Sequence, residues 1–434
     1  MSVVPCPSSS TPARGPLDRR RVLRRKTYSC DRRRFDGESL SIFDTAIRTS
    51  TEPKQGAEST FEFLQRVAGE FWDDVRQLLD EWVDNLPDEE RADIVGRLQS
   101  GDEVNFRGAV WEMFLHECLL QMGFQVTFHP DVPNTTTHPD FLAESDDCSF
   151  YLEATVVHED EADRGGGKRK AVIYEEINRR VNSDDVFLHV EFPRESKDTP
   201  AVSKLGIALG AYLANDMDLD TVRDQYDAGG LLDVDSFTWD DSDHSGWIVR
   251  ATPIPKASPS PSDRIVGVMG GRAGSVDDVS PIRTSLTRKA GHYGKLMDRP
   301  YVIAVQSDRK FTDEIDFTSA LFGDEVVQIE KVTGHTSVSR IPNGLWRQKK
   351  GHAASNVSAV VTTSNFGLPY QRSLTLTCYM HPAPDIPLEC ETDFMRTRRV
   401  EPAGTLSDSE PTEDAPALRS LPAEWPRGRP FPKE

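Results

Sequence analysis

The feature that most constrains the fold of this chain is an uninterrupted apolar run, Tyr301-Val302-Ile303-Ala304-Val305. A strand with one face in water alternates apolar and polar residues, so a continuous run indicates a strand buried on both faces. Both faces of such a sheet must be covered by helices. A segment with helical spacing, 282–293, directly precedes the run. We therefore expect an α/β fold, with a mixed sheet and helices on its faces.

Other segments of the chain show the same two kinds of periodicity. The helical patterns cover 59–82, 87–98, 105–122, 172–181 and 201–214. The strand patterns cover 124–128, 140–143, 150–157, 186–192, 247–251, 357–362 and 374–379. The stretch 253–263 is rich in Pro and Ser and is expected to be a loop.

Both ends of the chain lack such periodicity, and we predict that both are disordered. Residues 1–57 are rich in Ser, Pro and Arg, and residues 385–434 are rich in Pro and acidic residues. The predicted organisation is a disordered basic N-terminal arm (1–57), packing helices (58–104), an α/β domain with insertions (105–384) and a disordered tail (385–434). The arm could bind nucleic acid, but a solvated tail or a wrongly assigned start codon is the plainer interpretation.

Charge and composition exclude several classes of protein. Net charge is −20, and residues 1–40 hold ten Lys/Arg and four Asp/Glu, which leaves −26 for the remainder. A body this acidic does not bind nucleic acid non-specifically, and any contact with nucleic acid needs a local basic surface. The chain has no apolar run long enough for a membrane helix and no secretory signal. Its six cysteines form no C-x-x-C pair, so we expect reduced thiols and a cytoplasmic location.

The segment 140–157 brings two carboxylates together. A four-residue loop at 145–148 makes it a β-hairpin that pairs Ala143 with Phe150, and Asp140 with Glu153. Glu153 lies in mid-strand among apolar neighbours, where an unpaired carboxylate is costly. Facing carboxylates repel each other, and a divalent cation bound to both would remove that repulsion.

A third carboxylate comes from the preceding helix. Glu112 follows Trp111 and lies three and seven residues before Leu115 and Leu119, so it borders the buried stripe and can reach the sheet. The sequence therefore predicts that three carboxylates converge on one site.

Glu112 in a helix, Pro139-Asp140 at a strand start and Glu153-Ala154-Thr155 on the next strand resemble the pattern of the PD-(D/E)xK, or restriction-endonuclease-like, nuclease superfamily. The stretch 105–157 also resembles a group of uncharacterised bacterial proteins with this core, here with E-x-T in place of E-x-K. The resemblance implies an αβββαβ core, with extra helices and strands in this chain.

The resemblance also implies roles for these residues. Asp140, Glu153 and the Ala154 carbonyl would bind Mg²⁺ or Mn²⁺, and Glu112 would support the metal or its waters. Such a metal lowers the pKa of a water and neutralises charge on a scissile phosphate.

Thr155 stands where the superfamily has its lysine, and a hydroxyl can only form a hydrogen bond. A lysine from elsewhere is expected to replace it, and the candidates are Lys168, Lys170 and Lys289. We favour Lys289, because its helix and the 301–305 strand could close the core. The helix and strand at 172–192 compete for that place.

Further basic residues and histidines are candidates for contacts with nucleic acid. Lys168, Arg169 and Lys170 follow three glycines, and a flexible loop there could bring them to phosphates; a solvated loop is an equal alternative. Its spacing is not that of a nucleotide-triphosphate loop. The cluster of Trp346 with Arg347, Lys349 and Lys350 is interpreted as a solvated loop, although it could stack a base. His116, His129 and His138 fit no zinc signature and are interpreted as ordinary histidines.

Two functions remain open at this point, and a purely structural mixed α/β protein is a third alternative. The first is a metal-dependent nucleic-acid phosphodiesterase, an endonuclease. Its expected substrate is DNA in preference to RNA, and it could work as a homodimer. The second is an inactive module of the same fold that binds nucleic acid or protein. The three carboxylates favour the first, whereas Thr155 and the acidic charge favour the second.

Overall fold

The computed structural model describes most of the chain from residue 41 onward. The described residues are 41–56, 58–133, 135–158, 161–198, 200–261, 264–269, 277–293, 297–309, 312–329, 336–364, 366–367, 374–390, 393–400, 406–419 and 421–431. The prediction of disorder for residues 1–40 lies outside them. Ile42 and Phe43 are buried in the core, so the ordered body includes part of the predicted arm.

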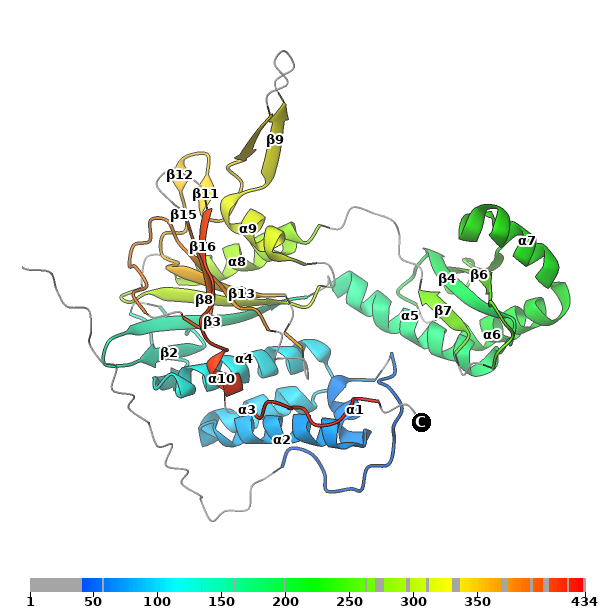
Figure 1. The fold of residues 1–434 in the computed structure, drawn as a ribbon, viewed down its shortest axis with the longest axis horizontal. Coiled ribbons are helices and arrows are strands. Elements are labelled where there is room, and N and C mark those ends of the chain that lie inside the picture. The colour runs from blue at the N-terminus through cyan, green and yellow to red at the C-terminus, as the bar shows by residue number, and fades with distance from the viewer. Residues whose placement is uncertain are drawn as a thin grey trace, which may run out of the picture. The chain divides into compact units, whose positions relative to one another are not determined.

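An eight-stranded mixed sheet forms the centre of the fold (Figure 1). Its strands, in spatial order, are β1 (Gln125–Phe128), β2 (Phe141–Glu144), β3 (Ser149–Val157), β8 (Tyr301–Ser307), β13 (Ala359–Thr363), β14 (Thr377–Met380), β15 (Arg396–Val400) and β16 (Leu406–Ser409). β8 runs parallel to β3 and β13, and all seven of its residues are buried. The α/β class and the doubly buried strand at 301–305 are thus confirmed.

Helices cover both faces of this sheet, and each face has its own hydrophobic core. On one face lie α1 (Thr60–Arg66), α2 (Glu70–Asp84), α3 (Asp88–Gln99), α4 (Glu103–Gln121) and α10 (Pro416–Arg419). The other face carries α8 (Val279–Tyr293) and α9 (Glu314–Phe322). Among the described residues, no helix combines the length and the apolar character needed to span a membrane.

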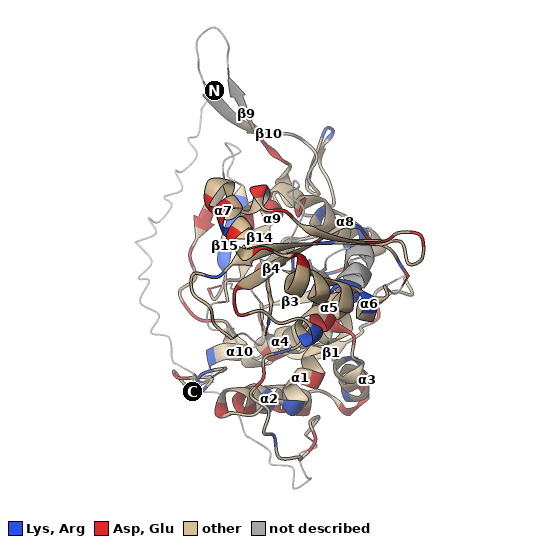
Figure 2. Cartoon of the chain, turned by 90° about the vertical axis from the view of Figure 1, so that its right-hand side faces the viewer, with Lys and Arg blue, Asp and Glu red and all other residues tan. Residues whose placement is uncertain are grey.

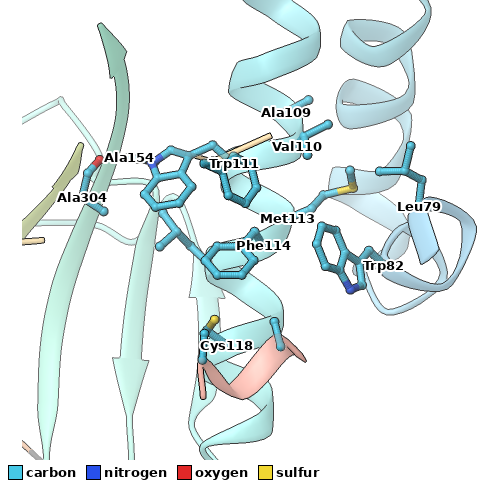
Figure 3. Close-up of a cluster of buried hydrophobic side chains, with 14 of the residues drawn as sticks. Leu79, Trp82, Ala109, Val110, Trp111, Met113, Phe114, Cys118, Ala154 and Ala304 are labelled. Carbon is cyan, nitrogen blue, oxygen red and sulfur yellow. Dashed lines mark hydrogen bonds between the residues drawn. The ribbon is translucent and has the colours of Figure 1, made fainter. Parts of the chain in front are cut away.

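Helix α4 is the central packing element of the first face. The Asp102 side chain caps its start by accepting hydrogen bonds from the first backbone N–H groups. Trp111 and Phe114 point towards the strands, while Met113 points towards α2 (Figure 3). The indole N–H of Trp111, a fully buried side chain, donates to the carbonyl oxygen of Ala304 at 3.2 Å. This anchor holds α4, and with it Glu112, on the sheet.

A second, four-stranded sheet belongs to an insertion between β3 and α8, with a core of its own. Its elements are α5 (Glu161–Arg180), β4 (Val186–Arg194), α6 (Val202–Ala211), a π-helical turn (Tyr212–Asp216), α7 (Leu219–Gly229), a 3₁₀ turn (Gly230–Asp233), β5 (Phe237–Asp241), β6 (Trp247–Pro255) and β7 (Val266–Met269). The strand order is β5-β6-β4-β7. The helix and strand at 172–192 therefore belong to the insertion, and α8 and β8 join the main sheet after β3.

Two short ribbons complete the described strands. They are β9 (Glu325–Ile329) with β10 (Thr336–Arg340), and β11 (Arg347–Gln348) with β12 (Gly351–His352). Trp346 is fully buried, whereas Arg347, Lys349 and Lys350 are exposed. The indole is therefore not available to stack on a base beside these cations.

The prediction of a disordered tail from residue 385 is wrong. β15 and β16 form one edge of the main sheet, and Leu418 and Trp425 are buried in the core. An edge strand is half exposed and can be rich in charge, so it shows little hydrophobic periodicity. Here an ion pair between Arg398 and Asp408, at 2.5 Å, joins the two strands.

Two further predictions are also wrong. Cys148 and Cys390 form a disulfide, so these two of the six thiols are not reduced. A sequence separation of 242 residues hid their proximity. The stretch 165–170 is not a loop but lies within α5, because helical hydrogen bonding across 161–180 tolerates the three glycines despite their low propensity.

Candidate active site

The β2–β3 hairpin places Asp140 beside the middle of β3. The predicted pairing of Ala143 with Phe150 is confirmed, and the β2–β3 ladder ends with Phe141 opposite Leu152. Asp140 comes one residue before β2, so the same register sets it opposite Glu153. Its Oδ2 accepts a hydrogen bond of 2.6 Å from the backbone N–H of Ala154. The Asp140 side chain therefore accepts a hydrogen bond from β3 just beyond the point where the backbone pairing of β2 with β3 ends.

Glu153 points to the sheet face that α8 covers, and only 4% of the residue is exposed. Lys289 Nζ contacts its Oε1, and the Tyr293 hydroxyl donates to its Oε2 at 2.8 Å. Two residues further along β3, Thr155 Oγ1 lies 3.3 Å from Ser285 Oγ. Residues four apart share one face of a helix, so α8 presents Ser285, Lys289 and Tyr293 to β3 as a row.

Glu112 belongs to α4, on the opposite face of the sheet. Arg97 of α3 holds both of its carboxylate oxygens, at 2.6 and 2.8 Å. Gly108 leaves room for this pair, because a Cβ there would lie 2.9 Å from Arg97 Nη2. The three predicted carboxylates therefore approach one another from both faces, but Glu112 is turned towards Arg97.

The surroundings of Asp140 disfavour the ionised form of its carboxyl group. Burial, followed by the negative charges of Glu153 and Glu112, raises its pKa to about 7; Lys289 and the Ala154 N–H oppose this rise. An ordinary aspartate is fully ionised well below neutral pH. The negative charge of the ionised Asp140 carboxylate is therefore not balanced by enough positive charge nearby.

The donor atoms at this point suit a hard divalent cation. Within a strand, the C=O of a residue points to the same side as its N–H, so the Ala154 carbonyl points towards Asp140. Two carboxylates and a carbonyl are oxygen ligands of the kind that Mg²⁺ takes, with waters completing its shell. Among the described residues, no three His, Cys, Asp or Glu side chains are grouped to hold a metal ion. In this structure Arg97 pairs with Glu112, and Lys289 pairs with Glu153.

A cleft of about 920 Å³ lies between α4, the second half of β3 and the first half of α8. Its described lining includes Arg97, Glu112, Ala154, Thr155, His158, Ser285, Arg288 and Arg309, but neither Asp140 nor Glu153. Acidic residues are prominent elsewhere, for example on α7 and α9 (Figure 2). Arg97 is paired with Glu112 and Arg309 with Asp278, so Arg288 is the lining arginine best placed to attract an anionic ligand within this acidic body.

Other residues singled out from the sequence lie away from this centre. Arg169 and Lys170 are absent from the described lining of the cleft, and Lys170 pairs with Glu195 at 2.7 Å. The side chain of Lys168 is outside the described part. His116 is a core residue packed on Phe128, and burial lowers its pKa to about 4.

The two loop histidines have carboxylate neighbours of their own. His129 lies 3.4 Å from Glu90, and His138 lies 3.5 Å from Asp131. Interpreting the three histidines as ordinary agrees with these contacts.

Sequence reasoning missed Arg97, Ser285, Tyr293 and His158. A signal for two of them was present, because Ser285, Lys289 and Tyr293 are spaced by four residues. Nothing local marks Arg97, whose role depends on the packing of α3 against α4. Comparisons with family models, curated proteins and solved structures found no significant match for this chain.

Proposed function

We propose that this chain is a metal-dependent nucleic-acid phosphodiesterase with a restriction-endonuclease-like core. The observation that carries the proposal is the pairing of Asp140 and Glu153 across the hairpin, with Lys289 of α8 on Glu153. The order α4, β1, β2, β3, α8, β8 in the main sheet and its helices supports the αβββαβ assignment.

Each residue of the proposed site would have its own chemical role. Asp140, Glu153 and the Ala154 carbonyl would hold Mg²⁺ or Mn²⁺. When bound, the cation lowers the pKa of a water and neutralises charge on the phosphate. Arg97 orients Glu112 towards the cleft, and Arg288 supplies a cation for the phosphate backbone.

Lys289 takes the place of the lysine that β3 lacks. Its ammonium reaches the site from α8 and already contacts Glu153, on the sheet face that Thr155 also shares. Were a cation bound at Glu153, this ammonium would be free to orient water and to stabilise charge that develops on the phosphate. Thr155 contributes only a hydrogen bond to Ser285.

The alternative is an inactive nuclease-fold module that binds nucleic acid. One observation favours it: Glu153 is satisfied by Lys289 and Tyr293, and Glu112 by Arg97, without any metal. Such pairs compete with metal binding. The choice between the two functions rests on whether a divalent cation displaces Lys289 from Glu153.

Metal titration and cleavage assays test the proposal. Calorimetric titration with Mg²⁺ and Mn²⁺ compares the wild type with Asp140→Asn and with Asp131→Asn, whose carboxylate is 99% exposed and serves as the matched control. Cleavage of single- and double-stranded DNA and of RNA is then measured for the same proteins.

We expect Asp140→Asn alone to lose metal binding, and cleavage to fall by roughly 10²-fold or more. A wild type that binds metal and cleaves nothing supports the inactive module. Unchanged cleavage by Asp140→Asn refutes the site.

A further inference from the structure

A histidine and an aspartate lie together at the far end of the cleft. His158 follows β3 and Asp308 follows β8, so the parallel pairing of these strands brings the two side by side. His158 Nδ1 lies 2.6 Å from Asp308 Oδ2, and the side chains are only 12% and 13% exposed. None of the carboxylate chemistry described above uses this pair.

Asp308 fixes the orientation of the histidine ring. With Nδ1–H directed to the carboxylate, the other ring nitrogen, Nε2, is on the far side of the ring, and His158 lines the cleft. The second oxygen of Asp308, Oδ1, is buried and has no hydrogen-bond partner within the described part of the chain. Arg107 Nε lies 3.7 Å from Oδ2 and 3.7 Å from Glu103. The contact with Asp308 therefore holds the His158 ring in one orientation at the cleft.

The distance from the carboxylate centre excludes a direct role in the same reaction step. His158 is four residues beyond Ala154, which corresponds to ~13 Å along a strand. Successive phosphates of a nucleic-acid strand wind around the helix axis and are about twice as far apart as the axial rise of about 3.4 Å, so this length spans about two nucleotides. The cleft runs over the same length, because its lining extends from Glu112 and Ala154 to His158 and Arg309.

We propose that His158, held by Asp308, binds a second phosphate of the same strand, about two nucleotides from the phosphate at Asp140 and Glu153. The inference rests on the proposed function and specifies its substrate as an oligonucleotide strand that lies along the end of β3. In the complex, Nδ1–H would donate to Asp308 and Nε2–H to an anionic phosphate oxygen, which is a charge-assisted hydrogen bond. His158 is then a positioning residue for the substrate.

Other charged groups surround this end of the cleft. Arg309 also lines the cleft and is paired with Asp278 at 2.5 Å, while Asp277 adds a negative charge at the start of α8. His158 and Arg309 are two groups at this end of the cleft that can donate a hydrogen bond to a phosphate.

Binding experiments in EDTA test the anchor separately from cleavage. A fluorescein-labelled thymidine hexanucleotide is titrated with the wild type, His158→Gln and Asp308→Asn, and unlabelled hexanucleotide and dinucleotide serve as competitors. His129→Gln is the matched control, since His129 is 54% exposed and pairs with Glu90. Thermal melts of each variant report on folding.

We expect His158→Gln to lose about tenfold in affinity for the hexanucleotide and nothing for the dinucleotide, which is too short to reach both ends. Asp308→Asn should show a smaller loss of the same kind, and His129→Gln none. The inference is overturned if His158→Gln binds the hexanucleotide as the wild type does, or if it loses affinity equally for the hexanucleotide and the dinucleotide. It is also overturned if the wild type does not bind the hexanucleotide. If binding behaves as expected while the wild type cleaves nothing with Mg²⁺ or Mn²⁺, the anchor stands and the proposed catalysis fails.

Discussion

Asp140→Asn should make the metal-free protein more stable at alkaline pH while removing its metal site. The folded-state pKa of Asp140 is raised from 3.8 to about 7, chiefly by burial and by the charges of Glu153 and Glu112. For a group whose folded pKa is raised, stability is fully present below the unfolded pKa and is lost as pH rises through the folded pKa. The wild type therefore loses stability between about pH 4 and about pH 7.

The size of this loss follows from the shift. A shift of about three pH units at 1.36 kcal/mol each sets an upper bound of about 4 kcal/mol. Water penetration into an open cleft screens part of it, so we expect about 1–2 kcal/mol in practice. Asparagine cannot ionise, and its carbonyl oxygen can still accept the hydrogen bond from the Ala154 N–H. The variant should therefore keep the hairpin contact without the charge repulsion.

Thermal and denaturant unfolding in EDTA, from pH 4 to pH 8, measures the effect. We expect the two proteins to be similar near pH 4 and Asp140→Asn to be the more stable at pH 8. Adding Mg²⁺ should raise the stability of the wild type alone. Glu153→Gln is the informative contrast, because it leaves Lys289 without its carboxylate and should be destabilising. If Asp140→Asn is less stable than the wild type at pH 8, the assigned repulsion does not exist.

Three other predictions concern the lysine, the C-terminal segment and the disulfide. In a Mg²⁺-dependent cleavage assay, Lys289→Met should lose roughly 10²-fold or more in rate, whereas Thr155→Ala removes one hydrogen bond worth ~0.5–1.5 kcal/mol; equal losses would contradict the role given to Lys289. Removing 385–434 should abolish the cooperative melt, because β15, β16 and Trp425 leave with it, and a truncated chain that melts like the full one would place these strands outside the core. Cys148→Ser with Cys390→Ser should lower the melting temperature of the oxidised protein and leave the reduced protein unchanged, which melts with and without dithiothreitol will show.

The amino-acid sequence by itself determined the local features of this protein. The uninterrupted apolar run at 301–305 indicated the central strand, and the four-residue loop at 145–148 set the register that opposes Asp140 to Glu153. Side-chain alternation in a strand has a period of two residues, so the face on which Glu153 lies follows from its neighbours alone. These inferences succeeded because each depends on interactions within a few residues of chain.

The tertiary structure alone decided which groups meet the carboxylates. Lys289 is 136 residues from Glu153, beyond an inserted sheet. The order of the elements favoured it over Lys168 and Lys170, but only the packing of α8 on β3 brings its ammonium to Glu153. The pairing of Arg97 with Glu112 depends in the same way on α3 lying against α4. The strands β15 and β16 were missed because an edge strand is held by ladder hydrogen bonds and ion pairs, which leave little pattern of hydrophobicity in the sequence.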